Sequence, residues 1–229
     1  VADAEAMIKA CADNNVKLGV GYRLHYEPHN LEMRRICAEQ VFGDLKVIQA
    51  DFGFTIGDPN QWRLNKKLAG GGALMDVGIY CIQAARYCTG QEPVAVTAQE
   101  FKTDNSKFSE VDETLYWQME FPGGISANCT TSYAINVHQL KVNFNKGWAR
   151  LSPAFDYGPL QGQTSSADIQ IQYDNVYEQA LHMDDFALSI IEDKPVKVPG
   201  EEGLRDMKII TGIYESIKRN STKVPLRLI

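Results

Sequence analysis

The residues best suited to chemistry in this 229-residue sequence lie between Trp62 and Tyr80. Three consecutive glycines, Gly70–Gly72, precede a predicted helix in which Asp76 and Tyr80 are four residues apart. Because residues four apart share one helix face, this spacing places a carboxylate beside a phenol. Such a pair can orient a hydroxyl group and exchange a proton with it. The alternative is a hydrogen bond on the helix surface with no catalytic role, which is the more common use of such a pair.

The glycine triplet also has two interpretations. Glycines before a helix bring backbone N–H groups close to a bound group, where the helix dipole favours negative charge. They equally allow a tight turn into a helix with no ligand present. Since Gly70–Gly72 follows no short strand of a β–α–β unit, the triplet is not the dinucleotide-binding fingerprint.

Composition and charge exclude several classes of protein. The chain has 23 basic and 29 acidic residues and no basic block, which argues against nucleic-acid binding and against membrane binding through a polybasic segment. No apolar run approaches the ~18 residues of a membrane span, and no secretory signal opens the sequence. Five cysteines, an odd number without a C-x-x-C pair, predict buried free thiols in a reducing cytoplasm.

The elements that must position these residues follow from the hydrophobic periodicity. The predicted helices span 2–15, 28–40, 74–88, 177–192 and 201–219. The predicted strands span 16–22, 45–56, 94–101, 114–121, 125–133, 140–144 and 148–151, and 152–174 is expected to be irregular. About six hairpin-linked strands after the second helix predict an α+β fold with an open, mixed and largely antiparallel sheet and helices on one face. The first helix and strand are typical of the end of a parallel α/β sheet.

The segment His25-Tyr26-Glu27-Pro28-His29 superficially suggests a metal site. Zinc-protease chemistry requires both histidines on one continuous helix turn, and Pro28 breaks that arrangement. We therefore predict no metal site.

The motif W-R-x-x-x-x-x-A-G-G-G-x-L-x-D-x-G-x-Y, running from Trp62 to Tyr80, resembles the glucose–fructose oxidoreductase, inositol dehydrogenase and rhizopine-catabolism family (Gfo/Idh/MocA). Its tyrosine ending is similar to the glucose–fructose oxidoreductase branch. Gly21-Tyr22-Arg23 resembles the family's domain crossover, and Pro199–Gly203 and Ile213–Ser216 resemble its C-terminal helices.

This resemblance implies a remnant of a dinucleotide-binding Rossmann domain at 1–22 and a substrate-binding and dimerisation domain at 23–229. It implies an oxidoreductase that transfers hydride between NAD or NADP and a sugar or polyol. The implied catalytic residues are Asp76, which would bind and orient the substrate, and Tyr80, which would exchange the hydroxyl proton. The implied cofactor-side residues are Trp62, Arg63 and, more weakly, Tyr177. Placement alone suggests Arg23, His25 and Tyr133 for the sugar pocket.

The sequence departs from the family pattern at its beginning. The family's G-x-G-x-x-G turn and its Glu-Lys-Pro motif both precede the point where this sequence starts, at Val1. The lysine of that motif would be the cation that makes Tyr80 a useful base, so we expect no such cation here. We therefore expect the chain alone to be inactive and a longer parent to be active. The alternative is a sugar-binding or assembly domain without redox turnover.

Four aromatic residues on the predicted sheet suggest self-association: Phe52, Phe54, Tyr116 and Trp117. If these side chains faced water they would form a large apolar surface, which predicts a homodimer or tetramer through the sheet face. Coverage by the closing helices of the same chain is the alternative.

Overall fold

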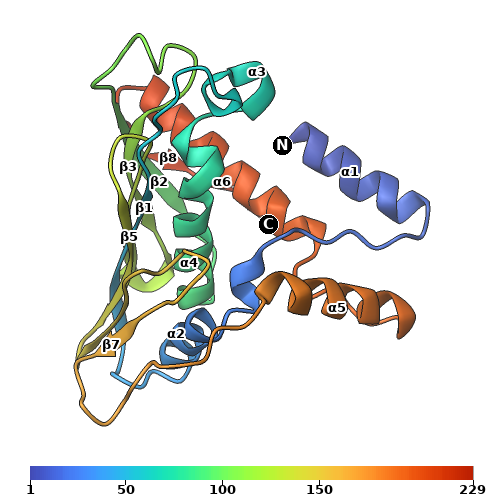
Figure 1. The fold of residues 1–229 in the computed structure, drawn as a ribbon, viewed down its shortest axis with the longest axis vertical. Coiled ribbons are helices and arrows are strands. Elements are labelled where there is room, and N and C mark those ends of the chain that lie inside the picture. The colour runs from blue at the N-terminus through green and yellow to red at the C-terminus, as the bar shows by residue number, and fades with distance from the viewer. Residues whose placement is uncertain (229) are drawn as a thin grey trace.

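The computed structural model describes residues 1–228 and has one eight-stranded sheet as its main layer (Figure 1). The helices are α1 (Ala2–Asp13), α2 (Pro28–Ala38), α3 (Lys66–Ala69), α4 (Ile79–Thr89), α5 (Glu178–Ile191) and α6 (Gly200–Lys218). The strands are β1 (Leu45–Gly53), β2 (Ala95–Phe101), β3 (Thr114–Glu120), β4 (Ser126–Ser132), β5 (Val137–Phe144), β6 (Trp148–Leu151), β7 (Gly162–Thr164) and β8 (Val224–Pro225).

The sheet is open and mixed, with the strand order β7-β6-β5-β1-β4-β3-β2-β8. Strands β1 and β4 pair in parallel, with Ala50 opposite Cys129, and the other neighbouring strands of the described chain pair antiparallel. The predicted α+β class and open sheet are confirmed. The two strands that prediction missed, β7 and β8, have three and two residues and carry too little pattern to be recognised.

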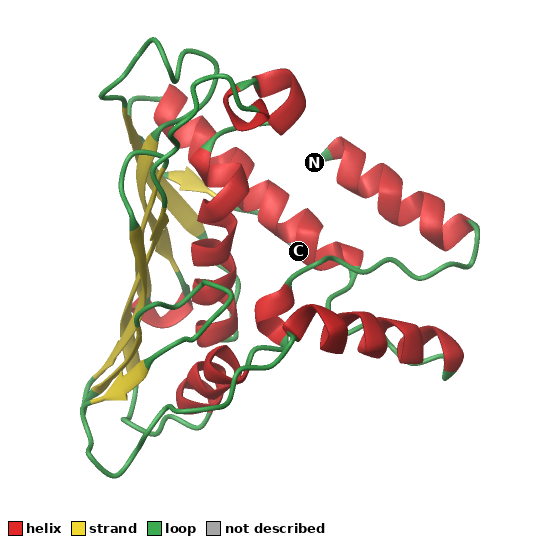
Figure 2. Cartoon of the chain, viewed as in Figure 1, coloured by secondary structure: helices red, strands yellow, loops and turns green. Residues whose placement is uncertain are grey.

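The helices α2, α4 and α6 cover one face of the sheet (Figure 2). Along β1, Ile48, Ala50 and Phe52 point toward these helices and are buried, as the period-two alternation of a strand requires. Neighbouring side chains on a strand point to opposite faces, so Trp117 is buried at 3% exposure while Tyr116 on the other face is 48% exposed. Of the four aromatic residues expected on the sheet, Phe52 and Trp117 are therefore covered within the chain, Phe54 is partly buried against the core, and Tyr116 is exposed.

The predicted strand at 16–22 was also wrong. This segment forms one isolated bridge, between Gly19 and Pro199, supported by the Val20 N–H group donating to the Val198 carbonyl. An apolar run becomes a strand only where a neighbouring strand satisfies its backbone groups, and within residues 1–228 the segment has only this short contact.

The predicted helix at 74–88 begins with an irregular turn. Leu74–Gly78 is π-helical and continues directly into α4. A Cβ atom on Gly78 would lie 3.2 Å from the Thr131 side chain of β4, so glycine allows close packing of this turn on the sheet. The Thr131 hydroxyl lies 3.0 Å from the Phe52 carbonyl oxygen and 3.1 Å from that of Ala73, so its one hydrogen is shared between β1 and the residue before the π-helical turn. Single π-helical turns are often found at functional sites.

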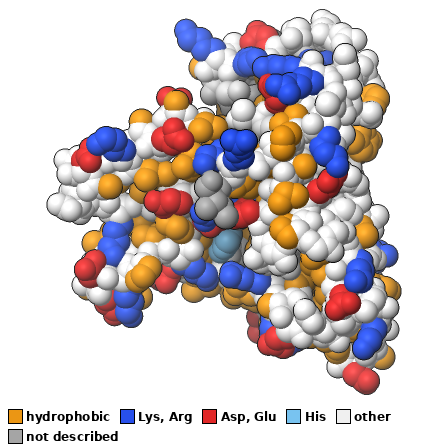
Figure 3. Space-filling model, turned by 180° about the vertical axis from the view of Figure 1, so that it is seen from behind, with side chains coloured by type: hydrophobic (Ala, Val, Ile, Leu, Met, Phe, Trp, Pro, Cys, Tyr) orange, Lys and Arg blue, Asp and Glu red, His pale blue; other side chains and the backbone are white. Residues whose placement is uncertain are grey.

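The helices α1 and α5 project away from the sheet (Figure 1). Apolar side chains gather along this projecting arm (Figure 3). Those that are at least 44% exposed on the two helices are Met7, Leu181, Met183, Leu188, Ile190 and Ile191. Soluble monomers rarely leave a contiguous apolar surface of any size uncovered.

All five cysteines are free, as predicted, and Cys37, Cys81, Cys88 and Cys129 are buried. Burial raises the pKa of the Cys81, Cys88 and Cys129 thiols well above their usual value. These thiols are therefore protonated core residues and not nucleophiles.

The stretch Lys66–Thr89 is long and apolar enough to cross a membrane by length and composition alone. Of the most apolar 18 residues of this stretch, 61% are buried inside the fold. The apolar character of this stretch is accounted for by its packing against the sheet, as in the core helix of a soluble protein.

Candidate active site

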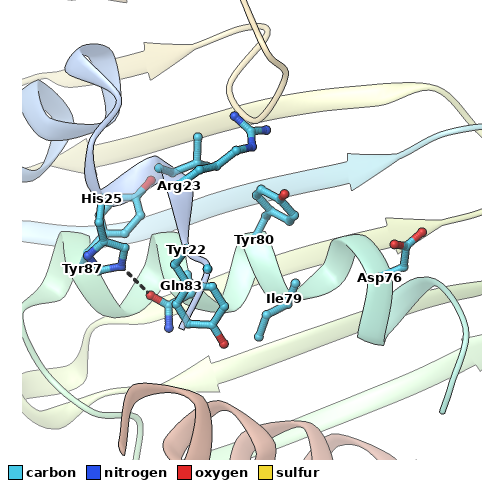
Figure 4. Close-up of a pocket in the computed structure, with 10 residues that line it drawn as sticks. Tyr22, Arg23, His25, Asp76, Ile79, Tyr80, Gln83 and Tyr87 are labelled. Atoms are coloured by element: carbon cyan, nitrogen blue, oxygen red, sulfur yellow. Dashed lines mark hydrogen bonds between the residues drawn. The ribbon is translucent and has the colours of Figure 1, made fainter. Parts of the chain in front are cut away.

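A cavity of about 200 Å³ lies between the segment 21–25 and helix α4 (Figure 4). Four residues predicted from the sequence line it: Asp76, Tyr80, Arg23 and His25. The remaining lining residues are Gly21, Tyr22, Leu24, Ile79, Gln83 and Tyr87. The cavity therefore joins side chains from three separate parts of the chain, namely the segment 21–25, the π-helical turn and α4.

Tyr80 has a cation beside it, contrary to expectation. The Arg23 guanidinium lies 5.4 Å from the centre of the Tyr80 ring, and Arg23 is only 6% exposed. Burial by itself would lower the pKa of Arg23, but the nearby Tyr80 and Glu178 raise it above its usual value. The buried Glu178 carboxylate pairs with Arg23 at 2.5 Å. The sequence placed Arg23 near the pocket but gave no sign of its contacts with Tyr80 and Glu178, because these residues are far apart in the chain.

Asp76 is held by two donors from other segments. Its Oδ2 atom accepts from Arg63 Nε at 2.8 Å and from the Tyr133 hydroxyl at 3.0 Å. Burial, and next the charge of Asp76, raise the pKa of Tyr133 far above its usual value, so Tyr133 stays a protonated donor. Asp76 makes no hydrogen bond to Tyr80 within residues 1–228, so the predicted pair shares a cavity without direct contact.

The other predicted site residues do not line the cavity. Tyr133 is buried and reaches the cavity only through Asp76. Trp62 is 51% exposed, and the Arg63 guanidinium lies 4.6 Å from its ring centre. Tyr177 is 71% exposed at the start of α5 and does not line the cavity, whereas the next residue, Glu178, is the partner of Arg23.

The glycine triplet packs against a buried carboxylate, Asp112. The backbone N–H groups of Gly72 and Leu74 donate to the two oxygens of Asp112 at 2.9 and 2.8 Å, and the Tyr214 hydroxyl donates to it at 2.7 Å. A Cβ atom on Gly72 would lie 2.2 Å from the Asp112 carbonyl oxygen. The N–H groups of Gly72 and Leu74 are therefore used within the fold, as in a tight turn. Asp112 itself was missed, because its neighbours in the sequence carry no motif.

His25 is fixed at the far end of the cavity from Asp76 (Figure 4). Its Nε2 atom lies 2.9 Å from the Gln83 side-chain oxygen, and its ring lies between those of Tyr22 and Tyr87. Burial lowers the pKa of His25 below its usual value, which favours the neutral imidazole.

The second histidine of the sequence motif has different partners. The His29 ring bonds to Glu27 at 2.7 Å and accepts from the Tyr173 N–H group, away from the contacts of His25. Within residues 1–228, no three His, Cys, Asp or Glu side chains are grouped as metal ligands.

The described residues do not form a cradle for the phosphates of a dinucleotide. The Gly72 N–H group, which could have bound a phosphate, is already bonded to Asp112. The exposed Trp62 ring lies under the Arg63 guanidinium.

Comparisons with known proteins identify the family of the chain. The family model for the GFO/IDH/MocA C-terminal domain matches residues 30–150. The chain is 30% identical over 229 aligned positions to the D-xylose 1-dehydrogenase [NADP(+)] of Haloarcula marismortui, covering 96% of this chain and 63% of that protein. It is 29% identical to the D-glucoside 3-dehydrogenase of Escherichia coli, covering 85% of this chain and 60% of that protein. The chain thus spans less than two thirds of these curated relatives.

A solved structure gives a closer match. The aldose-aldose oxidoreductase of Caulobacter crescentus, complexed with glycerol, superposes with a TM-score of 0.90 at 39% identity. The match covers 98% of this chain and 68% of that chain. The eight-stranded sheet, the family model and these similarities together show that the chain belongs to the Gfo/Idh/MocA family, of which it contains the C-terminal domain.

Proposed function

We propose that this chain forms the substrate side of an NAD(P)-dependent oxidoreductase that acts on a sugar or polyol. The observation that carries the proposal is that Tyr80, Arg23 and Asp76 line one cavity. The names of the relatives, which are dehydrogenases of D-xylose and of D-glucosides, support the same class of substrate.

Each residue has a role that follows from its contacts. Tyr80 exchanges a proton with the hydroxyl group that becomes a carbonyl. The Arg23 guanidinium, 5.4 Å from the centre of the Tyr80 ring, holds the ring in place in the cavity. Asp76, held by Arg63 and Tyr133, accepts a hydrogen bond from a substrate hydroxyl through a free lone pair and so orients the substrate.

The cofactor, NAD or NADP, supplies or accepts hydride in this proposal, and a dinucleotide-binding domain binds most of it. Residues 1–22 form the last part of this domain. The exposed apolar side chains on α1 and α5 form a surface suited to packing against the rest of it. Trp62 and Arg63 face the nicotinamide, and Tyr177 has a weaker role on the same side. We expect the chain by itself to lack turnover, because residues 1–228 offer no phosphate cradle.

The proposal includes assembly and location. The outer sheet face, with Tyr116 and Phe101 exposed and their ring centres 5.7 Å apart, forms a homo-oligomer contact. The protein acts in the cytoplasm, binds no nucleic acid and does not enter a membrane.

The experiment is an assay of nicotinamide reduction with D-xylose, D-glucose and polyols, using protein purified from its native source. We expect turnover in the natural protein and a loss of ~10²–10⁴-fold in kcat for Tyr80→Phe, the usual contribution of acid–base catalysis. Tyr116→Phe is the control, since this tyrosine lies on the opposite face of the sheet and should keep full activity.

Two outcomes contradict the proposal. Turnover of Tyr80→Phe within about twofold of the natural protein would remove Tyr80 from the chemistry, because acid–base catalysis is worth far more than that. Sugar binding without any nicotinamide reduction would favour the non-catalytic binding or assembly domain.

A further inference from the structure

The Tyr80 ring lies against side chains from three separate parts of the chain. The Phe52 ring of β1 meets it edge-on, with the ring centres 5.2 Å apart, and the centre of the Phe155 ring is 6.2 Å away. Both phenylalanines are buried. The third neighbour is the Arg23 guanidinium, which reaches toward Tyr80 from the segment 21–25 (Figure 4). Arg23 is thus the polar member of an otherwise aromatic set of contacts.

The Arg23 guanidinium is itself fixed by two further segments of the chain. Its Nη1 atom donates to the Glu178 carboxylate at 2.5 Å and to the Asp156 carbonyl at 3.1 Å, and its Nη2 atom donates to the Phe155 carbonyl. The Tyr157 ring centre lies 4.0 Å from the guanidinium carbon. A guanidinium is planar and presents its donors in a fixed fork, so these bonds set its orientation as well as its position.

Glu178 is the partner that balances the charge of Arg23. It is the first residue of α5 and is 4% exposed. Among residues 1–228, Arg23 is the one side chain that donates to its carboxylate. A buried cation without a counter-charge is costly, so Glu178 allows the buried Arg23 to stay ionised beside Tyr80. Since α5 projects away from the sheet (Figure 1), Glu178 connects the start of this helix to the cavity.

Stability alone gives little reason for a buried ion pair at this place. Apolar side chains of similar volume can often replace such a pair at no cost in stability, because the cost of removing two charges from water offsets their attraction. Apolar side chains cannot provide the directed hydrogen bonds of an arginine. Through these bonds Arg23 joins α5 to the segment 155–157, and it lies against Tyr80 at the same time.

We propose that Glu178 is a positioning residue, which holds Arg23 against Tyr80 and so keeps the tyrosine hydroxyl where the proton is exchanged. The inference rests on the proposed function and deepens it, because it adds a residue of α5 to the site. Glu178 does not line the cavity, so it acts through Arg23 and does not contact the substrate.

The first test reads the surroundings of Tyr80 without any reaction. The natural protein is produced with 3-fluorotyrosine, and the ¹⁹F resonance of Tyr80 is assigned by its loss in Tyr80→Phe. In Glu178→Gln, which removes the charge but little volume, we expect this resonance to shift toward that of the unfolded protein. Glu192→Gln should leave it unchanged, since Glu192 is exposed just beyond the other end of α5. An unchanged Tyr80 resonance in Glu178→Gln would overturn the inference.

The second test uses the double variant Arg23→Met with Glu178→Leu, which separates positioning from folding. The double variant should keep the fold even if Glu178→Gln does not, because it leaves no buried charge unpaired. We expect the same shift of the Tyr80 resonance, and a kcat for nicotinamide reduction that falls about tenfold or more while KM stays within about threefold.

Two results of the second test would refute the positioning role. A folded double variant with the natural Tyr80 resonance and the natural kcat would show that the pair serves stability alone. A rise in KM with kcat unchanged would show that the pair serves substrate binding instead. If the ¹⁹F resonance shifts as expected but the natural protein reduces no nicotinamide, the proposed function fails while the placement of Tyr80 by Glu178 stands.

Discussion

At the scale of residues, the candidate site is made of side chains that share a cavity but have separate partners. Asp76 is held by Arg63 and Tyr133, whereas Tyr80 lies beside Arg23. The spacing of Asp76 and Tyr80 in the sequence predicted that they lie on one side of a helix, and both line the cavity. It could not predict their pairing, since Arg23 and Tyr80 are brought together only by the fold.

His25 is expected to titrate below the usual midpoint of ~6.5. Burial lowers its pKa, and the charges of Arg34 and Lys197 act in the same direction while Glu202 opposes them. Between the folded-state pKa and 6.5 the unfolded chain binds more protons, so this contribution to stability is present above ~6.5 and is lost as the pH falls through that window.

The measurement is the NMR titration of the His25 ring protons, assigned by their disappearance in His25→Gln. A midpoint at or above ~6.5 would contradict the buried, neutral imidazole. Because the pKa of Asp206 is raised to about 6, its contribution to stability has the opposite sign and falls as the pH rises through that region. The contribution of His25 is therefore the difference in the free energy of unfolding between the natural protein and His25→Gln at each pH, because Asp206 is present in both.

At the scale of elements, the start of α4 shows where a sequence pattern has more than one explanation. The Gly70–Gly72 triplet fits a ligand-binding turn and a packed turn equally well, and only the fold reveals Asp112 beneath it. The hairpins at Pro122–Gly124 and Asn145–Gly147 were predictable, because turn residues act locally. The strand predicted at 16–22 does not form, because a strand needs a partner from elsewhere in the chain and the local sequence does not show whether one is present.

Gly72→Ala is expected to destabilise the fold by about 3 kcal/mol or more. The new Cβ atom would lie 2.2 Å from the Asp112 carbonyl oxygen, and the contact is with backbone that cannot rotate away. Gly57→Ala is the matched control, because a Cβ atom there meets nothing within 4 Å, and its effect should stay within about 1 kcal/mol. The measurement is the free energy of unfolding of each variant, obtained by urea titration. Equal stability of the two variants would show that Gly72 is not closely packed.

At the scale of the whole molecule, the sheet separates two surfaces with different uses. Its covered face carries α2, α4 and α6 and, through α4, the cavity. Its open face exposes Tyr116 and Phe101 among polar side chains. The open sheet was predictable from strand number and hairpins, whereas the face on which each aromatic lies depended on the register of single strands.

Tyr116→Lys is expected to prevent the proposed self-association at micromolar concentration, because it would place a charge in the proposed apolar contact of the open face. Sedimentation velocity gives the mass of the protein in solution, and Gln91→Lys serves as the control at an exposed position outside the strands. A natural protein that sediments only as a monomer would contradict assembly through this face.

The most direct test of the central claim is a crystal structure of the natural protein with a polyol and oxidised nicotinamide cofactor. The account predicts a substrate hydroxyl within hydrogen-bond distance of the Tyr80 oxygen and a second hydroxyl bonded to Asp76, with the sugar in the cavity between segment 21–25 and α4. A polyol bound elsewhere on the molecule, with no contact to Tyr80, would contradict it.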